Sequence, residues 1–419
     1  MLSPLRRRIV GAVMRAGELS RSDLARRLGL SRSSLSPEIS DLLAMGVLIA
    51  DRRGASTGGR RGALLTPAGP GIAVLAGVDI DADRVSVALT ALDGTVLATD
   101  TLEMAAADDP EIALRGAAEM IERDLEPGAG PLQAIGISIA ADVDPTTGRP
   151  VSAPTMPRWA DWPVCDFFAE RFGVRSFIDN DVNVLALAEA AHPRTGPGLG
   201  RSFIVMKISR GLGCGIVVDG KVFRGNAGFA GDLGHICADQ HDRTLCACGN
   251  RGCLEVLAGE PAILNAANAL ADDGRSPILG ALRVQNDGVL TLSLVGDASA
   301  AGDAAVGSLL RDVGKHIGFV LAGVVSFFNP SAVLVSSGLG GGEDILLNAI
   351  RELIYQRALP FSTRGLQVMR SHFHRDGGAV SAAVLAAEGW IGMAGTVAER
   401  RGLPSSVNGS TVVTDGIGP

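Results

Sequence analysis

Residues 231–255 read GDLGHICADQHDRTLCACGNRGCLE, and no other stretch of the chain carries so specific a pattern. The sequence has six cysteines. Three of them, Cys246, Cys248 and Cys253, crowd together here, and His235 precedes them in a Gly-His pair. Clustered cysteines in an intracellular protein are more often metal ligands than a disulfide framework. The stretch therefore predicts a metal site in the second half of the chain.

Length and hydropathy set the wider frame. A chain of 419 residues is too long for one ordinary core, so we expect two or three domains. No run of eighteen uncharged apolar residues occurs, and the N-terminus MLSPLRRRIV lacks the order of an export signal. These features predict a soluble cytoplasmic protein with no membrane partner.

Charge is distributed unevenly along the chain. Residues 1–66 contain twelve Arg against five Asp or Glu, which is a net charge of about +7. Because the whole chain has a net charge of −7, the remaining residues carry about −14. A basic head on an acidic body indicates that the head meets a polyanion such as nucleic acid, because Arg supplies the salt-dependent part of that affinity. The alternative is a merely solvated basic face.

Three short helices are predicted in this head. A first helix ends at Gly17, a second spans residues 22–28, and after the turn at Gly29 a third follows the capping residue Ser31. This layout is typical of a helix-turn-helix, whose last helix reads base edges in the major groove of double-stranded DNA. The candidate base-contacting residues in the first turns of that helix are Arg32, Ser33, Ser34 and Ser36.

A wing follows the third helix. Residues 47–49 and 63–65 read as strands, and the Gly-rich basic loop between them carries Arg52, Arg53, Arg60 and Arg61, which could reach phosphates or a minor groove. Residues 1–66 are therefore predicted to form a winged helix-turn-helix. The alternative is a three-helix packing domain. Pro37 lies inside the third helix, where it removes a backbone hydrogen bond and favours a kink or an early end.

The body has an α/β pattern. Residues 67–71 form an uncharged, Pro-containing linker, and short apolar strands then alternate with Ala-rich helical stretches. Glycine-turn strand pairs occur in both halves, which predicts two related lobes with a cleft between them. We place the first lobe at residues 72–197, completed by a helix near 378–400, and the second at 198–377. Residues 402–419 are predicted to be a disordered tail.

From about residue 71 to 389 the chain resembles the ROK family, named for repressors, open reading frames and kinases. The resemblance implies a two-lobed actin-like fold, as in sugar kinases and Hsp70-type ATPases. It also implies that His235, Cys246, Cys248 and Cys253 bind Zn²⁺, whereas Cys237 and His241 do not match family ligands. One imidazole and three thiolates complete a tetrahedral set, so the zinc would be structural. Ordinary buried cysteines are the alternative.

Residues 178–183, IDNDVN, resemble the sugar-binding segment of the family. The resemblance makes Asp181 the former general base and Asn180 a ligand of a sugar hydroxyl, and adds Asp232, Glu255 and His235 to the pocket. A carboxylate beside an amide suits a polyol, whose hydroxyls both donate and accept hydrogen bonds. The alternative is an Asn/Asp turn that caps the next helix.

Departures from the active family members argue against kinase activity. Residues 79–84 read DIDADR, which places carboxylates where active relatives have a DxGGT-like phosphate turn, and like charges repel a nucleotide. Arg210 replaces a small hydroxyl residue in the second phosphate turn, and could fill the phosphate space or pair with Asp81 or Asp83. Asp142 stands where relatives have a Pro-Gly-Pro turn, and Thr155 where they often have Asn.

Three functions are compatible with these patterns. The favoured one is a sugar-responsive DNA-binding transcription regulator, a repressor that acts as a homodimer or higher homo-oligomer on an operator and has lost kinase activity. The second is an ATP-dependent sugar kinase with an appended DNA-binding domain. The third is a DNA-binding protein that responds to no ligand.

Overall fold

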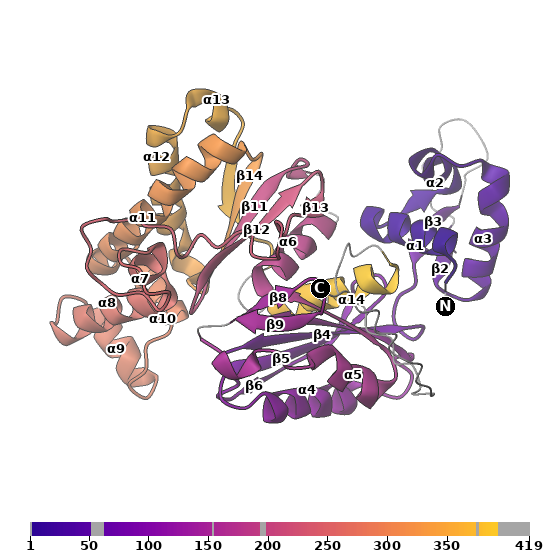
Figure 1. Ribbon diagram of the computed structural model, residues 1–419, viewed down its shortest axis with the longest axis horizontal. Coiled ribbons are helices and arrows are strands. Elements are labelled where there is room, and N and C mark those ends of the chain that lie inside the picture. The colour runs from indigo at the N-terminus through magenta and orange to yellow at the C-terminus, as the bar shows by residue number, and fades with distance from the viewer. Residues whose placement is uncertain (1, 52–62, 153–154, 193–197, 374–376, 393–419) are drawn as a thin grey trace, which may run out of the picture.

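The computed structural model describes residues 2–51, 63–152, 155–192, 198–373 and 377–392. Its N-terminal part contains α1 (Pro4–Ala16), α2 (Arg21–Leu28) and α3 (Arg32–Ala44). A small sheet, in the order β1-β3-β2, joins β1 (Leu19–Ser20), β3 (Leu64–Pro67) and β2 (Leu48–Asp51). These elements form a separate head beside the body of the molecule (Figure 1).

N-cap serines and a C-cap glycine define the ends of helices in the head. Ser20 and Ser31 accept hydrogen bonds from backbone N–H groups in the first turns of α2 and α3, and Gly29 ends α2 in the left-handed conformation. Helix α3 is continuous through Pro37, so the early end that the proline favoured does not occur. The basic loop expected between β2 and β3 lies outside the described residues, although the two flanking strands pair antiparallel.

The first sheet of the body has the order β10-β7-β4-β5-β6. Strands β4, β5 and β6 form an antiparallel meander, and β7 and β10 extend it in parallel on the β4 side. The bounds are β4 (Val74–Asp81), β5 (Arg84–Ala91), β6 (Val96–Glu103), β7 (Leu132–Ile139) and β10 (Arg175–Asn180). A hairpin of β8 (Asp142–Asp144) and β9 (Arg149–Ser152) follows β7.

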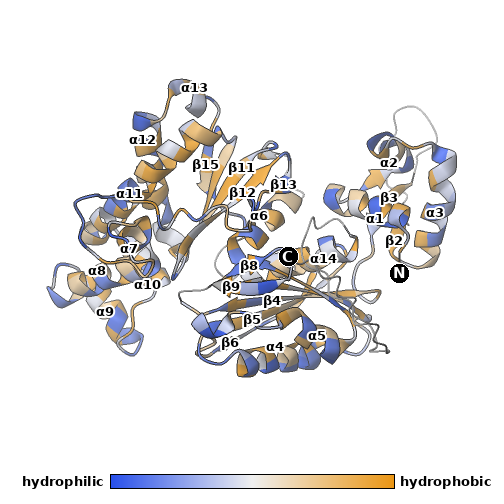
Figure 2. Cartoon of the chain, viewed as in Figure 1, coloured by the Kyte–Doolittle hydropathy of each residue, from blue (hydrophilic) through white to orange (hydrophobic). Residues whose placement is uncertain are grey.

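The second sheet repeats this topology. Its order is β13-β12-β11-β14-β15, again an antiparallel meander extended by two parallel strands. The bounds are β11 (Phe203–Ile208), β12 (Leu212–Val218), β13 (Lys221–Val222), β14 (Ala332–Ser336) and β15 (Gln367–Arg370). The strands of this sheet are largely hydrophobic in Figure 2, as expected of strands that are covered on both faces. The two halves predicted from glycine-turn strand pairs are thus related in topology.

Helices cover both sheets. On the first sheet, α4 (Pro110–Asp124) and α5 (Val164–Phe172) pack on one face and α14 (Gly378–Trp390) on the other (Figure 1). Helix α14 reaches the strands because β4 and β7 present glycines there. A Cβ atom on Gly77 or Gly136 would lie 1.9 Å from a backbone oxygen of α14. The C-terminal helix therefore returns to the first half of the body.

The second half contains a helical layer of its own. Helix α11 (Ala304–Phe328) packs against α12 (Glu343–Arg357), and shorter helices surround them. Helix α6 (Asp181–Ala191) links the two halves, since it contacts both α14 and β12. The remaining elements are η1 (Pro157–Trp159), α7 (Leu254–Ala258), α8 (Glu260–Asp272), α9 (Pro277–Gln285), α10 (Leu292–Ala300), η3 (Gly340–Gly342) and α13 (Pro360–Thr363). No helix in the described parts of the chain is long and apolar enough to cross a membrane.

Candidate metal centre and ligand cleft

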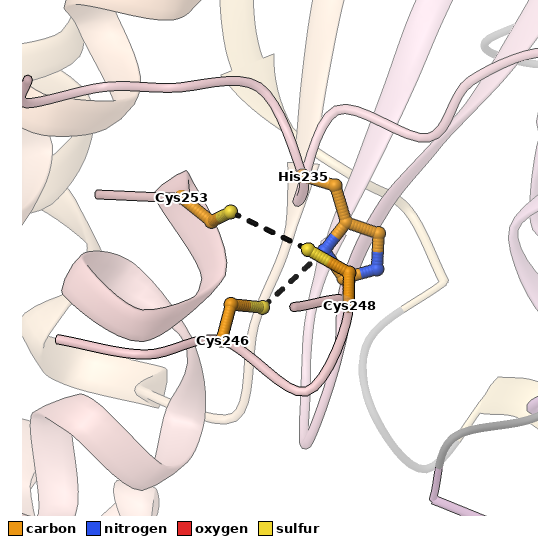
Figure 3. A group of neighbouring side chains, drawn as sticks. All are labelled: His235, Cys246, Cys248 and Cys253. Carbon is orange, nitrogen blue, oxygen red and sulfur yellow. Dashed lines mark hydrogen bonds between the residues drawn. The ribbon is translucent and has the colours of Figure 1, made fainter. Parts of the chain in front are cut away.

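The histidine and three cysteines singled out in the sequence converge at one point of the structure. His235, Cys246, Cys248 and Cys253 each offer a ligand atom, and these atoms all lie within 4.8 Å of one another. Figure 3 shows the imidazole and the three thiols directed toward a common centre. Cys253 directly precedes α7, while the other three lie in the long connection between β13 and α7. Cys237 and His241 are not members of the group.

The spacing of the group fits a tetrahedral metal ion. Zn–S bonds of about 2.3 Å and a Zn–N bond of about 2.0 Å imply roughly 3.8 Å between two sulfurs and roughly 3.5 Å between sulfur and nitrogen. The Sγ atoms of Cys248 and Cys253 are 3.7 Å apart, and Cys246 Sγ lies 3.5 Å from His235 Nδ1. The cluster could therefore hold a metal ion.

A cleft opens beside this centre, between the two halves of the body. It brings together all the residues that the sequence assigned to a ligand pocket, although they come from two separate stretches of the chain, residues 180–181 and 232–255. These residues are Asn180, Asp181, Asp232, His235 and Glu255. Asp142 and Thr155 also line the cleft. The residues fit a polyol ligand because they offer several hydrogen-bond acceptors and an amide in one cavity.

Asn180 and Asp181 lie where β10 ends and α6 begins. The side-chain oxygen of Asn180 accepts from the Val182 N–H at 3.2 Å, and its Nδ2 donates to the Ala141 carbonyl at 3.0 Å. Asn180 therefore caps α6, as the structural alternative proposed, and it also lines the cleft. The two interpretations do not exclude each other, because the cap fixes the side chain at the cleft wall.

Lys207 is a cleft residue that the sequence interpretation missed. Its Nζ donates to Asp181 Oδ2 at 2.6 Å, and both side chains are 11% exposed. Burial lowers the pKa of Lys207, but Asp181, Asp79 and Asp81 together outweigh it and raise the pKa above its usual value. Burial likewise raises the pKa of the Asp79 carboxyl, against the opposing charge of Lys207. A lysine inside the otherwise apolar strand FIVMKI was the signal that could have revealed this residue.

The far wall of the cleft is acidic. Burial, followed by the charges of Asp232 and Asp181, raises the pKa of Asp142 to about 6. Its carboxylate has no hydrogen-bond or ion-pair partner among the described residues, whereas Glu255 Oε2 accepts from the Leu212 N–H at 3.3 Å. Asp232 Oδ1 lies 4.0 Å from His235 Nε2, the ring nitrogen that does not face the cysteines.

Three carboxylates lie at the end of β4 and in the turn that follows it, namely Asp79, Asp81 and Asp83. Asp79 is buried and accepts from the Ser138 hydroxyl at 2.5 Å. Arg210 Nε pairs with Asp83 Oδ2 at 3.4 Å, which is one of the two ion pairs expected for this arginine. The turn after β4 and the turn between β11 and β12 are thus joined across the cleft.

The predicted DNA-binding residues divide between described and undescribed parts of the chain. Arg32, Ser33, Ser34 and Ser36 lie at the start of α3 and are exposed. Arg52, Arg53, Arg60 and Arg61 lie outside the described residues. The head also contacts the body, since Arg15 of α1 pairs with Glu388 of α14 at 3.1 Å. Apolar residues of the head and of α14 belong to one continuous core cluster.

Known proteins resemble this chain along most of its length. Residues 75–389 match the model of the ROK family. The xylose repressor of Caldicellulosiruptor bescii is 28% identical over 343 residues, covering 81% of this chain and 84% of the repressor. The transcriptional dual regulator NagC of Escherichia coli is 28% identical over 362 residues, covering 86% of each chain.

Two solved structures extend the comparison to the fold. A ROK family transcriptional regulator, described as a homologue of the Escherichia coli Mlc protein, covers 93% of this chain and 98% of its own, with a TM-score of 0.74 and 22% identity. A ROK family glucokinase from Streptomyces griseus, in complex with glucose and AMPPNP, covers 75% and 99%, with a TM-score of 0.64 and 27% identity. With a family match over most of its body and a mixed α/β sugar-kinase-like fold, this chain belongs to the ROK family.

Proposed function

We propose that this protein is a sugar-responsive, DNA-binding transcription regulator, and specifically a repressor. The observation that carries the proposal is the cleft lined by Asn180, Asp181 and Glu255, in a chain whose basic head packs on the same body. The relative named xylose repressor supports a sugar as effector. Such a regulator works on the chromosome, and therefore in the cytoplasm.

The head is proposed to be a winged helix-turn-helix that binds a double-stranded operator. Arg32 and the serines of α3 are exposed at the helix N-terminus, where the helix dipole and side chains can meet phosphates and base edges. The arginines at 52, 53, 60 and 61 would act as a wing. In this division residues 1–66 form the head, 67–71 a linker, and 72–197 and 198–377 the two lobes.

The metal ion is proposed to be Zn²⁺ in a structural role. His235 and the three cysteines would supply all four ligands of a tetrahedral ion, which would leave no position for a reacting water. The ion would fix the loop that carries Asp232 and His235 into the cleft. Its contribution is therefore to hold the ligand pocket in shape.

Catalysis of phosphoryl transfer is not part of the proposal. A general base must be free to accept the proton of the attacking hydroxyl. Here Lys207 occupies Asp181 Oδ2, and the Arg210–Asp83 ion pair joins the loops that would bind phosphates. The alternative, a sugar kinase with an appended head, predicts ATP turnover on a hexose panel with zinc-loaded protein, and flat traces would exclude it.

Helix α14 provides a route from the cleft to the head. Its first residue, Gly378, lies so close to Asp79 that an added Cβ would come within 2.1 Å of the carboxylate. Its last turns carry Glu388, the partner of Arg15 in the head. A ligand that changes the charges around Asp181 and Lys207 can thereby shift the head, provided that it binds the two arrangements with different affinity.

The experiment is a fluorescence anisotropy titration. Purified, zinc-loaded protein is added to labelled DNA from upstream of the gene that encodes it, and the titration is repeated with each of a panel of sugars. We expect DNA binding that weakens with salt, and a sugar that changes the affinity. Binding without any response would favour a ligand-independent DNA-binding protein. Absence of binding would contradict the proposal.

A further inference from the structure

A cysteine outside the metal group lies directly opposite one of its members. Cys237 pairs with Cys253 in an isolated antiparallel β-bridge. Backbone hydrogen bonds flank the pair on both sides. They run from the Leu254 N–H to the Ile236 carbonyl at 2.9 Å and from the Ala238 N–H to the Gly252 carbonyl at 2.8 Å. Flanking bonds of this kind define the non-hydrogen-bonded type of antiparallel pair.

The backbone of this pair has the spacing that a disulfide requires. In a non-hydrogen-bonded pair the Cα atoms are about 4.5 Å apart and the two side chains leave the same face. A disulfide joins Cα atoms that are roughly 4.4–6.8 Å apart. The Cys237 sulfur now lies beside Gly252, 3.5 Å from the place that a Cβ atom on this glycine would take. Rotation about the Cα–Cβ bonds can therefore bring the sulfurs of Cys237 and Cys253 together.

We propose that Cys237 is an oxidation site, at which a peroxide joins Cys237 to Cys253 in a disulfide and so removes Cys253 from the metal group. Cys237 is exposed, so an oxidant in solution reaches its thiol, whereas Cys253 is only 1% exposed. An accessible thiol beside a second cysteine that can resolve it is the arrangement of redox sensors. Disulfides in cytosolic proteins are usually of this transient kind.

The reaction balances with hydrogen peroxide as a two-electron oxidant. The Cys237 sulfur attacks one peroxide oxygen, the O–O bond breaks, and the products are a sulfenic acid and one water. The Cys253 sulfur then attacks the Cys237 sulfur, so that the S–S bond forms and the S–O bond breaks. The departing hydroxide takes a proton from the Cys253 thiol, or from solvent where that sulfur is already ionised, and becomes a second water. Each sulfur loses one electron, and the peroxide gains two.

The disulfide would disrupt the metal group. Figure 3 shows Cys253 among the four side chains of the group, and its loss leaves three ligands, which rarely retain a structural ion. The same stretch of chain carries Asp232, His235 and Glu255 at the wall of the cleft. Oxidation is therefore expected to release zinc and loosen this wall. That consequence rests on the proposed function, whereas the disulfide rests on the β-bridge alone.

The test is treatment of the full-length, zinc-loaded protein with hydrogen peroxide. Intact-mass and peptide mass spectrometry locate any disulfide, and a colorimetric chelator measures released zinc. We expect a mass loss of two hydrogens, a linked peptide pair containing Cys237 and Cys253, and zinc release that dithiothreitol with added zinc reverses. Cys237→Ala should bind zinc normally but release it about tenfold more slowly or less under peroxide. Cys165→Ala is the control, because Cys165 is a buried cysteine on α5 and should leave the release rate unchanged.

Other disulfides would contradict the inference. The sulfurs of Cys248 and Cys253 are 3.7 Å apart, so oxidation confined to the metal group would link these two instead. A mapped Cys248–Cys253 disulfide, or zinc release from Cys237→Ala as fast as from the natural sequence, would overturn the role of Cys237.

Anisotropy titrations of DNA with the same samples separate this inference from the proposed function. A Cys237–Cys253 disulfide in a protein that binds no DNA would leave the oxidation site assigned and the regulatory function contradicted. A sugar-responsive DNA complex in a protein that forms no such disulfide would do the reverse.

Discussion

Lys207 places a buried positive charge among the carboxylates at the base of the cleft. Its ammonium group contacts Asp181 directly and neutralises a region that also contains Asp79 and Asp81. A buried cation among carboxylates stabilises the fold mainly because its removal leaves uncompensated charge. In the proposed function the same ion pair also occupies the carboxylate that a kinase would need, so this residue would have both a structural and a functional role.

Lys207→Met is therefore expected to lower the free energy of unfolding by about 3–5 kcal/mol, measured by urea denaturation. Arg210→Met is the control, because its ion pair with Asp83 is half-exposed and should be worth less than about 1 kcal/mol. Equal losses in the two variants would show that Lys207 does not hold the buried carboxylates together.

Asp142, unlike Lys207, is expected to lower the free energy of unfolding when it is charged, so its contribution depends on pH. Its pKa is about 6 in the folded protein and 3.8 in the reference state, so between these values the folded state binds more protons. Ionisation of Asp142 thus lowers stability as the pH rises from about 4 to 6. We expect Asp142→Asn to raise the free energy of unfolding by about 1–2 kcal/mol at pH 7.5, after allowance for partial exposure, and by nothing near pH 4. Parallel pH profiles of the two proteins would contradict this assignment.

The metal site can be tested one ligand at a time. Cys248→Ala should abolish stoichiometric zinc, measured by plasma emission spectrometry, and should destabilise the loop before α7, because three ligands rarely retain a structural ion. Cys237→Ala is the matched control, since Cys237 is an exposed cysteine in the same loop but outside the group. Equal zinc contents in the two variants would show that Cys248 is not a ligand.

At the scale of elements, α14 depends on the glycines of the first sheet. The helix lies directly on β4 and β7, and its own small residues, such as Ala382, complete the close approach. A side chain on the strand at this point would push the helix away from both the cleft and the head. The packing of α14 therefore bears on function as well as on stability.

Gly77→Ala is expected to cost about 2–3 kcal/mol of unfolding free energy, because its Cβ would lie 1.9 Å from the Ala379 carbonyl oxygen. Gly280→Ala in α9 is the control. Its Cβ would meet nothing within 4 Å, and alanine should add about 0.5–1 kcal/mol through helix propensity. Chemical denaturation of both variants measures the difference, and a neutral Gly77→Ala would refute the tight packing.

At the scale of the whole molecule, the ion pair between Arg15 and Glu388 connects the head to the body. We expect Glu388→Gln to reduce the sugar-induced change in operator affinity severalfold, about 1 kcal/mol of coupling, while half-site binding remains. Glu119→Gln, on the exposed side of α4, should respond as the natural sequence does. Anisotropy titrations with and without the active sugar compare the two variants. An undiminished response in Glu388→Gln would show that coupling does not pass through this contact.

Much of the local structure could be predicted from the sequence. The caps Ser20 and Ser31, the strands of both meanders and the metal-binding pattern ending at Cys253 all depend on residues close together in the chain. Periodicity, capping and ligand spacing express such short-range preferences directly. The residues that the family resemblance placed in a ligand pocket do line one cleft, and they come from two short segments, one at Asn180 and Asp181 and one ending at Glu255.

Long-range contacts were decided only by the tertiary structure. Lys207 meets Asp181 across 26 positions of the chain, and Arg15 meets Glu388 across 373. The exposure of Phe327 and Phe361 likewise follows from how α11 and α13 pack, because an aromatic residue in a sequence is as compatible with a core as with a surface. A sequence determines which groups are available and their local conformation. Which of them share a cleft, an ion pair or a surface depends on the packing of elements that are distant in the chain, and local preferences do not encode that packing.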